Sequence, residues 1–347
     1  DSRQNIRLWD EYRLTTWFDT FLPSFDYLGS QEAMEIMTDN AVWWMKTSGI
    51  DGFRQDAVKH VPNDFWRLLT KKLSKHIEKE EQREIYQIGE TFGSYDLISS
   101  YVNKGQLDAQ FNFNLYDVAL HAFLDSDGSF RILDEEMKKT FAVYGMDHLM
   151  GNLMDSHDKV RFMAYADGDI LLSSPDAEEI GWTDPPRVDD PDSYRKARLY
   201  LTYMLSIPGV PVIYYGDEIG MTGAADPDNR RVMRFGNGLS SAEKEMLREV
   251  KNIIHIRRNN SALRRGDFLS VLAEKDIYTF IRSDVNERVL VILNKAADKK
   301  DIRIPIPEIY DVQQARDITN NQIIPVENTI LNVPLDGISS RIMVLEK

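Results

Sequence analysis

The chain has 347 residues, with 42 lysines and arginines against 56 aspartates and glutamates, which gives a formal net charge of −14. A chain this acidic repels phosphate backbones, so we expect no nucleic-acid partner. Hydrophobic residues make up 42% of the sequence, but no apolar run approaches the roughly 18 residues of a membrane-spanning helix, so we expect no membrane span. There is no cysteine, which excludes disulfides and thiolate catalysis.

The first 29 residues are irregular and rich in aromatic side chains, and they end in the loop-like segment Leu22-Pro23-Ser24-Phe25-Asp26. The aromatic residues are Trp9, Tyr12, Trp17, Phe18, Phe21, Phe25 and Tyr27. Neither Met nor an apolar signal segment opens the chain, so we expect a cut point rather than a natural start.

Two helices and two strands are expected next. Ser30 is a suitable N-cap and Gly49 a suitable stop for a helix whose apolar positions are Met34, Met37, Ala41, Trp44 and Met45. A strand follows at about 50–57, and a second strand is predicted at about 84–89. Between them, Pro62 opens a helix with an inner face of Phe65, Leu68, Leu69, Leu73 and Ile77.

The middle of the chain continues the alternation of strands and helices. Residues 109–115 alternate apolar and polar, which predicts a strand. The acidic stretch 164–192 holds four prolines and is predicted to be a long loop. A helix at 194–206 leads to the apolar segment 208–218, predicted to contain a buried strand. Ser240 and Glu243 form a capping box before a helix at 241–258.

The pattern changes after about residue 262, where helical periodicity ends and short β-type runs with turns between them begin. We predict a separate all-β domain. Its clearest strands are 277–281, 288–294, 301–304 and 341–345.

Three apolar runs end in carboxylates with regular spacing. Glu90 lies 34 residues after Asp56, and Asp158 lies 68 residues after Glu90. One strand, one helix and their connections take roughly 30 residues or more, so the acids fit the ends of strands n, n+1 and n+3 of a repeating strand–helix barrel. Acids at such strand ends converge on one site. Five strands do not close an eight-stranded barrel, so we expect three further strand–helix units upstream.

The neighbours of these acids suggest different roles. Arg54 shares a strand face with Asp56 and favours its ionised form, as a nucleophile needs, although a structural ion pair is an alternative. Glu90 follows Gly89 in apolar surroundings that favour a protonated general acid, although a solvated strand-end acid is the alternative. His157 beside Asp158 suggests a ligand contact rather than a core histidine. The histidines lack the spacing of a metal motif, so any metal ligand is unknown.

Five segments, in order, resemble the α-amylase family, glycoside hydrolase family 13. They are 52–60 (the nucleophile segment), 87–90 (the acid/base segment), 153–158 (the third-acid segment), 208–218 (the last barrel strand) and 22–26 (the end of inserted domain B). Residues 226–231 also resemble a loop of the neopullulanase and oligo-α-glucosidase branches. The family usually has Asn where this chain has Ser156, and its Asp-x-x-x-Asn-His segment is absent here.

This resemblance implies an α/β fold, a (β/α)₈ TIM barrel of which the chain holds the C-terminal five units, followed by a β-sandwich. The implied domains are the tail of domain B at 1–29, the barrel portion at 30–260 and the β-sandwich at 261–347. An upstream barrel segment of the same protein is the implied partner. No cofactor is required for the chemistry, and a structural calcium ion is possible. The compartment is unknown, with a soluble periplasmic or extracellular location favoured over a cytoplasmic one.

The resemblance also implies the roles of the site residues in retaining hydrolysis of α-1,4 or α-1,6 bonds in starch-derived glucans or maltooligosaccharides. Asp56 is the nucleophile, Glu90 the acid/base and Asp158 the third acid. The implied substrate-binding residues are Arg54, His157, Lys59, His60, Asp226 and Arg230. Trp17, Tyr27, Phe92 and Trp182 are candidate aromatic platforms for sugar rings.

Three alternatives stay open at this point, one of which is that the chain alone is inert because it lacks its first barrel units. An α-glucan transglycosylase uses the same three acids, with a sugar in place of water. A non-catalytic amylase-like binding subunit is the third alternative, although such relatives typically lose an acid and this chain keeps all three.

Overall fold

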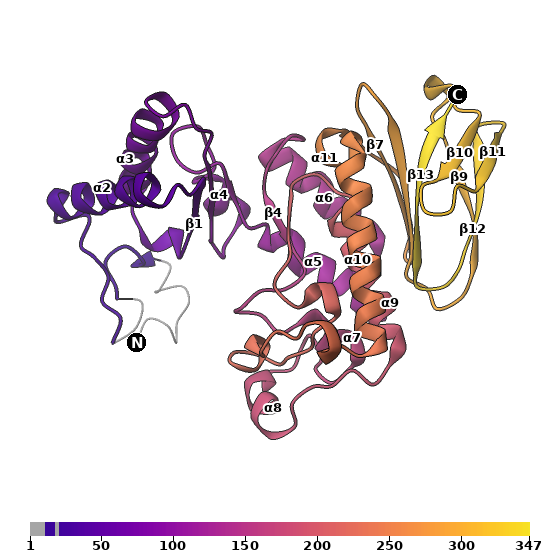
Figure 1. Ribbon diagram of the computed structural model, residues 1–347, viewed down its shortest axis with the longest axis horizontal. Helices are drawn as coiled ribbons and strands as arrows, with labels where there is room; N and C mark the ends of the chain where they lie inside the picture. The colour runs from indigo at the N-terminus through magenta and orange to yellow at the C-terminus, as the bar shows by residue number, and fades with distance from the viewer. Residues whose placement is uncertain (1–10, 18–20) are drawn as a thin grey trace. The chain divides into compact units, whose positions relative to one another are not determined.

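The computed structural model describes residues 11–17 and 21–347, which form two compact units (Figure 1). Unit 1 comprises Asp1–Asn114 and Leu149–Gly151, and unit 2 comprises Leu115–His148 and Asn152–Lys347. Trp9 and Phe18 of the aromatic N-terminal stretch lie outside the described residues. Within the described residues, every helix is too short or too polar to cross a bilayer. The boundaries predicted at 29/30 and 260/261 stay predictions.

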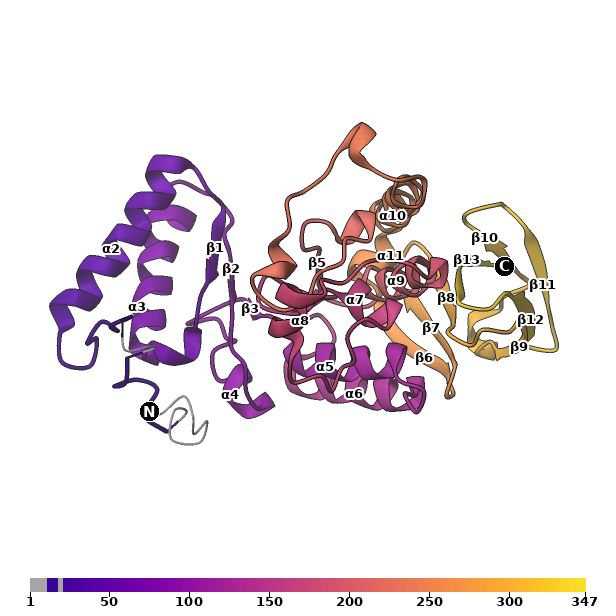
Figure 2. The same ribbon diagram turned by 90° about the horizontal axis from the view of Figure 1, so that it is seen from below.

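Unit 1 contains a parallel sheet and the helices that cover it. The strands β1 (Gly52–Gln55), β2 (Tyr86–Gly89) and β3 (Ala109–Gln110) pair in this order, with Gly52 opposite Tyr86 and Ile88 opposite Ala109. Helix α2 (Gln31–Ser48) packs against α3 (Asn63–Leu73), which continues into a π-helical turn at Ser74–Lys79. The short α4 (Tyr95–Ser99) follows β2. The core of this unit joins the two long helices to the sheet (Figure 2).

Helix α2 confirms the predicted caps. The Ser30 hydroxyl accepts a hydrogen bond from the Ala33 N–H at 3.1 Å, and Gly49 ends the helix in the left-handed region at φ 69°. Of the apolar positions named for this helix, Trp44 is 50% exposed. The buried stripe instead runs through Met34, Thr38, Val42 and Met45, which are spaced three or four residues apart.

The predicted middle strand at 109–115 is wrong in its second half. The strand β3 ends at Gln110, and helix α5 begins at Phe113 and runs to Leu124. The chain leaves the sheet where the Asn112 N–H donates to Gly151 O at 2.9 Å. Within the helix, Leu115, Tyr116, Ala119 and Leu120 are buried at helical spacing, so the longer 3.6-residue period overrides a short alternation.

The five predicted barrel strands are all present. Phe111 forms a parallel bridge with Gly151, the first residue of β4 (Gly151–Leu153). The strand β4 pairs with β5 (Val210–Val212). The prediction that the segment around β5 is buried is wrong, since its three residues are half-exposed; among the described strands, β5 pairs with β4 alone.

Unit 2 begins with helices that follow and connect these strands. They are α5 (Phe113–Leu124), α6 (Phe130–Tyr144), α7 (Phe162–Asp167), α8 (Ala177–Thr183), α9 (Pro191–Met204), α10 (Ser241–Asn259) and α11 (Ser261–Arg265), with 3₁₀ turns at Asp217–Ile219, Asp228–Arg230 and Gly236–Gly238. The capping box of α10 is confirmed, with the Ser240 hydroxyl and the Glu243 side chain each accepting the other residue's N–H.

The predicted loop at 164–192 is wrong in part, because it contains α8 and the end of α7. Its prolines lie outside these helices, and Pro191 occupies the first turn of α9, where a missing N–H costs nothing. The rest of the loop is organised by Asp167, whose carboxylate accepts hydrogen bonds from the backbone N–H groups of Asp189 and Asp190 and from the Ser193 hydroxyl.

The C-terminal part is all-β, as predicted. An antiparallel sheet has the order β6-β7-β8-β13-β10-β11-β12-β9. Ile281 of β7, Ile292 of β8 and Leu331 of β12 share one hydrophobic core, so the sheet folds over onto itself. The strands are β6 (Asp267–Ala273), β7 (Ile277–Ser283), β8 (Arg288–Asn294), β9 (Lys300–Pro305), β10 (Gln314–Asp317), β11 (Ile323–Glu327), β12 (Ile330–Leu335) and β13 (Ser339–Glu346), with a 3₁₀ turn at Glu308–Tyr310.

A buried arginine joins this sheet to the helices of unit 2. Arg282 of β7 is 1% exposed and donates to the carbonyl oxygens of Ser206, Leu263 and Gly266. Burial lowers the pKa of Arg282 to about 9. The guanidinium is stable there because its donors are used by carbonyls near the ends of α9 and α11; Leu263 O also accepts from Arg257 Nη1 at 2.7 Å.

The register of β1 and β2 generates a first prediction. A Cβ atom on Gly52 would lie 1.8 Å from the carbonyl oxygen of Tyr86, so the backbone of the paired strands would have to move. We expect Gly52→Ala to lower the free energy of unfolding by more than about 1 kcal/mol in urea denaturation. Gly238→Ala is the matched control, because its Cβ would meet no described atom closer than 3.8 Å. Equal stability of the two variants would show that the close approach of β1 to β2 at Gly52 does not contribute to stability.

Candidate active site

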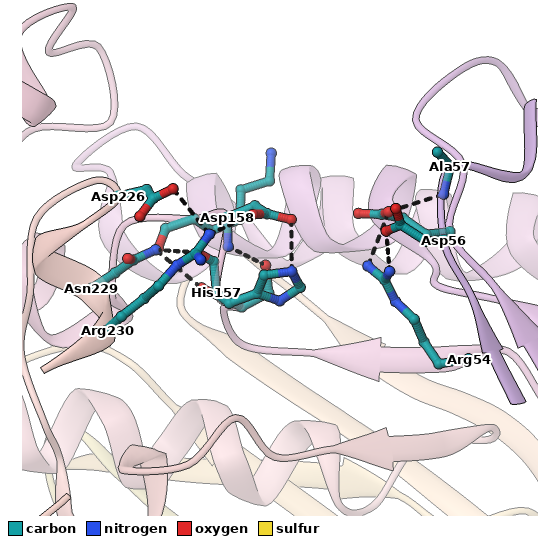
Figure 3. A network of polar contacts seen from close by, with 11 residues as sticks. Arg54, Asp56, Ala57, His157, Asp158, Asp226, Asn229 and Arg230 are labelled. Carbon is teal, nitrogen blue, oxygen red and sulfur yellow. Dashed lines mark hydrogen bonds and ion pairs between the residues drawn. The ribbon is translucent and has the colours of Figure 1, made fainter. Parts of the chain in front are cut away.

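One arginine lies against two carboxyl groups at the end of the parallel sheet in unit 1 (Figure 3). Arg54 of β1 forms ion pairs with Asp56 and with Glu90, whose Oε2 atom lies 2.9 Å from Nη2. The Asp56 side chain is 75% exposed, whereas that of Glu90 is 12% exposed. The two acids therefore share a cation but differ strongly in their access to water.

This difference in burial separates the two carboxyl groups chemically. Burial raises the pKa of Glu90, and a hydrogen bond with the Asp56 side chain and the charge of Asp56 raise it further. Arg54 and the Ala57 N–H act in the opposite direction, but the net pKa shift is upward. A carboxyl group with a raised pKa beside an exposed carboxylate is the arrangement expected for an acid and a nucleophile.

The backbone holds the two acids in this geometry. The Glu90 N–H donates to Gln55 O and the Val58 N–H donates to Glu90 O, both at 2.9 Å, so the β1–β2 pairing extends past both acids. Ala57 adopts φ 44°, an uncommon value for a residue with a side chain, and its N–H lies 3.4 Å from Glu90 Oε2 (Figure 3). This turn directs the chain away from the sheet directly after Asp56.

Two further predicted binding residues follow this turn. Lys59 is buried, at 7% exposure, and lies in the 3₁₀ turn Val58–His60. His60 is half-buried, with Nδ1 3.2 Å from the carbonyl oxygen of Arg13. Their proposed contacts with substrate stay predictions.

A second polar cluster lies in unit 2 and contains four predicted site residues (Figure 3). Arg230 Nη2 lies 3.2 Å from Asp158 Oδ1 and 2.9 Å from Asp226 Oδ2. His157 Nε2 lies 3.1 Å from Asp158 Oδ2. All four side chains are between 42% and 51% exposed, so they are accessible to a ligand.

Beneath this cluster lies a buried network that the sequence pattern did not predict. Arg161 is fully buried and donates to Asn229 O at 2.9 Å and Tyr215 O at 2.7 Å. Its guanidinium lies 4.1 Å from the Tyr214 ring centroid and 3.3 Å from Asp217 Oδ1. A basic residue within the apolar segment after Asp158 was the signal in the sequence for such a role.

Two buried acids complete the network. Burial raises the pKa of Asp155, and burial together with the neighbouring Asp155 charge raises the pKa of Asp217 well above its ordinary value. The interaction between the two carboxyl groups raises the pKa of Asp217 and lowers that of Asp155, whose carboxylate is also favoured by the charge of Arg161 and by the Phe162 N–H, so we place the proton on Asp217. One positive charge and one negative charge then remain in the buried network.

The candidate aromatic platforms differ in their surroundings. Phe92 stacks on Phe113 with ring centroids 3.8 Å apart and is 37% exposed. Tyr27 packs on Phe65 in the core of unit 1, which leaves less of its ring for a ligand. Trp17 and Trp182 are exposed at 53% and 71%. Their roles as platforms stay predictions.

The predicted site residues form two groups in the structure. Asp56, Glu90 and Arg54 meet in unit 1, while Asp158, His157, Asp226 and Arg230 meet in unit 2. The prediction that all three acids surround one sugar stays a prediction. In the part of the chain that the structure describes, no group of three His, Asp or Glu side chains has the arrangement of a metal site. The possible calcium ion stays a prediction.

Comparison with known proteins identifies one matching family, "Alpha amylase, catalytic domain", over residues 8–265. A cyclomaltodextrinase of Geobacillus thermopakistaniensis is 29% identical over 83% of this chain and 45% of its own length. Neopullulanase 2 of Thermoactinomyces vulgaris is 28% identical over 84% of this chain and 46% of its own length. The chain thus spans about half the length of these curated relatives.

Solved structures agree with the fold prediction. An α-amylase of Geobacillus thermoleovorans complexed with acarbose is 25% identical, with a TM-score of 0.81 over 97% of this chain and 69% of that chain. An α-amylase of Anoxybacillus is 28% identical, with a TM-score of 0.79 over 94% of this chain and 65% of that chain. The predicted fold class, a strand–helix barrel followed by an all-β domain, is confirmed.

The contact between Arg54 and Glu90 generates a prediction about ionisation. Arg54 lowers the pKa of Glu90 against the effect of burial, so Arg54→Gln should raise that pKa further. The measurement is a pH titration of ¹³C-labelled glutamate carboxyl groups by NMR. Arg67→Gln, which removes an exposed pair with Asp64, should leave the Glu90 titration unchanged. A Glu90 pKa that is unchanged or lower in Arg54→Gln would show that the guanidinium does not control it.

The buried acid pair generates a prediction about stability. Asp217 has a raised pKa in the folded chain, so the folded state binds more protons than the unfolded state. The free energy of unfolding therefore falls as pH rises above the pKa of Asp217 in the unfolded chain, about 3.9. Asp217→Asn should make this slope shallower by up to about 1.4 kcal/mol per pH unit. Urea denaturation at pH 5, 6.5 and 8 measures the slope, with the exposed Asp301→Asn as control. An unaltered slope in Asp217→Asn would rule out the buried proton.

Proposed function

Because the chain belongs to the α-amylase family, we propose that it carries the nucleophile and the acid/base of a retaining glycoside hydrolase acting on starch-type α-glucans. The observation that carries this proposal is the placement of exposed Asp56 and largely buried Glu90 against the same guanidinium, that of Arg54. The names of the relatives, cyclomaltodextrinase and neopullulanase, support the class of substrate.

The contact between the two carboxyl groups supports a retaining rather than an inverting reaction. Inverting enzymes keep their carboxyl groups about 6.5–9.5 Å apart to hold a water molecule, whereas retaining enzymes keep them about 5–5.5 Å apart. Asp56 and Glu90 both pair with the one guanidinium of Arg54, which supports the shorter separation. A glycosyl–aspartate intermediate is consistent with this separation.

In the proposed reaction, Glu90 first donates its proton to the glycosidic oxygen, and the Asp56 carboxylate attacks the anomeric carbon as the bond to that oxygen breaks. Glu90 is then ionised and takes a proton from the incoming water, whose oxygen displaces Asp56 and releases the sugar. Arg54 favours the ionised forms of both carboxyl groups, so it limits the cost of leaving Glu90 charged between the two steps.

Asp158, His157, Asp226 and Arg230 are assigned to sugar binding in this proposal. Their half-exposed oxygens and nitrogens provide both acceptors and donors, which suits the hydroxyl groups of a neutral glucan. The assignment of α-1,4 and α-1,6 linkages to this chain stays part of the proposal.

The nucleophile assignment has a direct test. In the full-length protein, Asp56→Asn should lower kcat/KM for maltotriose by about four orders of magnitude, because the amide cannot form the glycosyl intermediate. Time-resolved ¹H NMR of the wild-type reaction should show the α-anomer as the first product. Asp64→Asn, an exposed acid paired with Arg67, should retain activity. Near-normal turnover by Asp56→Asn, or a β-anomer as first product, would refute the proposal.

A further inference from the structure

The turn that carries Asp158 in unit 2 is held by a residue from a distant segment. Asn229 is fully buried, and its Nδ2 atom donates to His157 O at 2.8 Å and to Lys159 O at 2.9 Å. It also lies 3.5 Å from Ser156 O. These three carbonyls belong to the Ser156–Lys159 turn, so one amide group contacts the backbone on both sides of Asp158 (Figure 3).

The contacts determine which way the Asn229 amide points. With the nitrogen and oxygen exchanged, the side-chain oxygen would face two carbonyl oxygens at less than 3 Å, an arrangement without any donor. The turn has few side-chain bonds of its own: the Ser156 hydroxyl accepts from the Asp158 N–H at 3.2 Å. Asn229 therefore supplies the amide donor that ties the outer carbonyls of the turn together.

Asn229 is itself fixed by the buried network. The backbone carbonyl oxygen of Asn229 accepts from Arg161 Nε at 2.9 Å. Arg161 in turn contacts Tyr215 O and the buried Asp217. The next residue, Arg230, donates from Nε to the same His157 carbonyl at 3.1 Å and pairs through Nη2 with Asp158. Two consecutive residues therefore hold the turn: Asn229 contacts its backbone, and Arg230 contacts both its backbone and the Asp158 carboxylate.

We propose that Asn229 is a positioning residue that holds the Ser156–Lys159 turn, and with it the Asp158 carboxylate, in the orientation needed to bind a sugar ring. This inference rests on the proposed function and extends it to a residue without an accessible side chain. A displacement of about 1 Å at a reacting group can cost about 10²-fold in rate, so a loosened turn has a measurable effect.

The principal variant is Asn229→Asp, which keeps the size of the side chain but places a carboxylate oxygen against two carbonyl oxygens. In the full-length protein at 20 °C, we expect kcat/KM for maltotriose to fall about 10²-fold, with kcat falling more than KM rises. Native-state hydrogen exchange should show lost protection of the Lys159 amide, which donates to Ser156 O at 3.2 Å in the intact turn. Asn320→Asp, on an exposed turn of the β domain, is the matched control and should change neither quantity.

The remaining outcomes also decide the inference. Should Asn229→Asp fail to fold, Asn229→Ala takes its place, because it removes the donors without adding charge. If both variants are unfolded at 20 °C, Asn229 serves stability alone and the inference is overturned. Wild-type kcat/KM in a folded variant also overturns it, even if Tm falls. A wild-type protein that hydrolyses no glucan refutes the proposed function; in that case lost Lys159 protection in the variant supports the positioning role, and retained protection overturns it.

Discussion

The chemistry of this chain depends on one recurring interaction, a single guanidinium against two carboxyl groups. Arg54 lies between Asp56 and Glu90 in unit 1, and Arg161 lies beside the Asp155–Asp217 pair in unit 2. One positive charge stabilises one carboxylate well and two poorly when water is excluded, so the second acid tends to keep its proton. Access to water distinguishes the two cases. Asp56 is accessible to a reacting molecule, whereas Arg161, Asp155 and Asp217 are buried and contact only neighbouring parts of the chain.

The two sets also show why a raised pKa by itself does not identify a catalytic group. Asp217 and Glu90 both have raised pKa values, and burial is the largest cause for each. Asp217 is 1% exposed, and its oxygens are used by Arg161 and the Tyr214 N–H. Glu90 keeps a partly exposed side chain at the end of a parallel sheet, where such folds place their reactive groups. Position and accessibility, rather than ionisation, distinguish the two roles.

Much of this could be predicted from the sequence wherever the signal is local. The Ser30 and Gly49 caps, the Ser240 capping box and the carboxylates that directly follow β1 and β2 are short-range patterns, and the structure has them as predicted, whereas Asp158 lies in a turn after β4. Short patterns also mislead: the alternation at 109–115 belongs partly to a helix, and Trp44 follows helical spacing but lies outside the buried stripe. Asn229 and Arg161 were missed because their partners are about 70 residues away in the chain, so a local pattern could mark Arg161 as unusual but could not name its partners.

The buried guanidinium of Arg282 has a consequence for the modularity of unit 2. The change from helical to β-type sequence near residue 262 suggests a domain boundary at which the β domain could be exchanged. Yet the carbonyls at the ends of α9 and α11 obtain their donors from within the β sheet. A chain severed at that junction would lose the donors of Arg282, and of the three oxygens Leu263 O would keep its bond from Arg257 Nη1, so we expect the helices and the sheet of this unit to unfold cooperatively. The boundary in sequence pattern near residue 262 is therefore not a boundary between two independently stable parts.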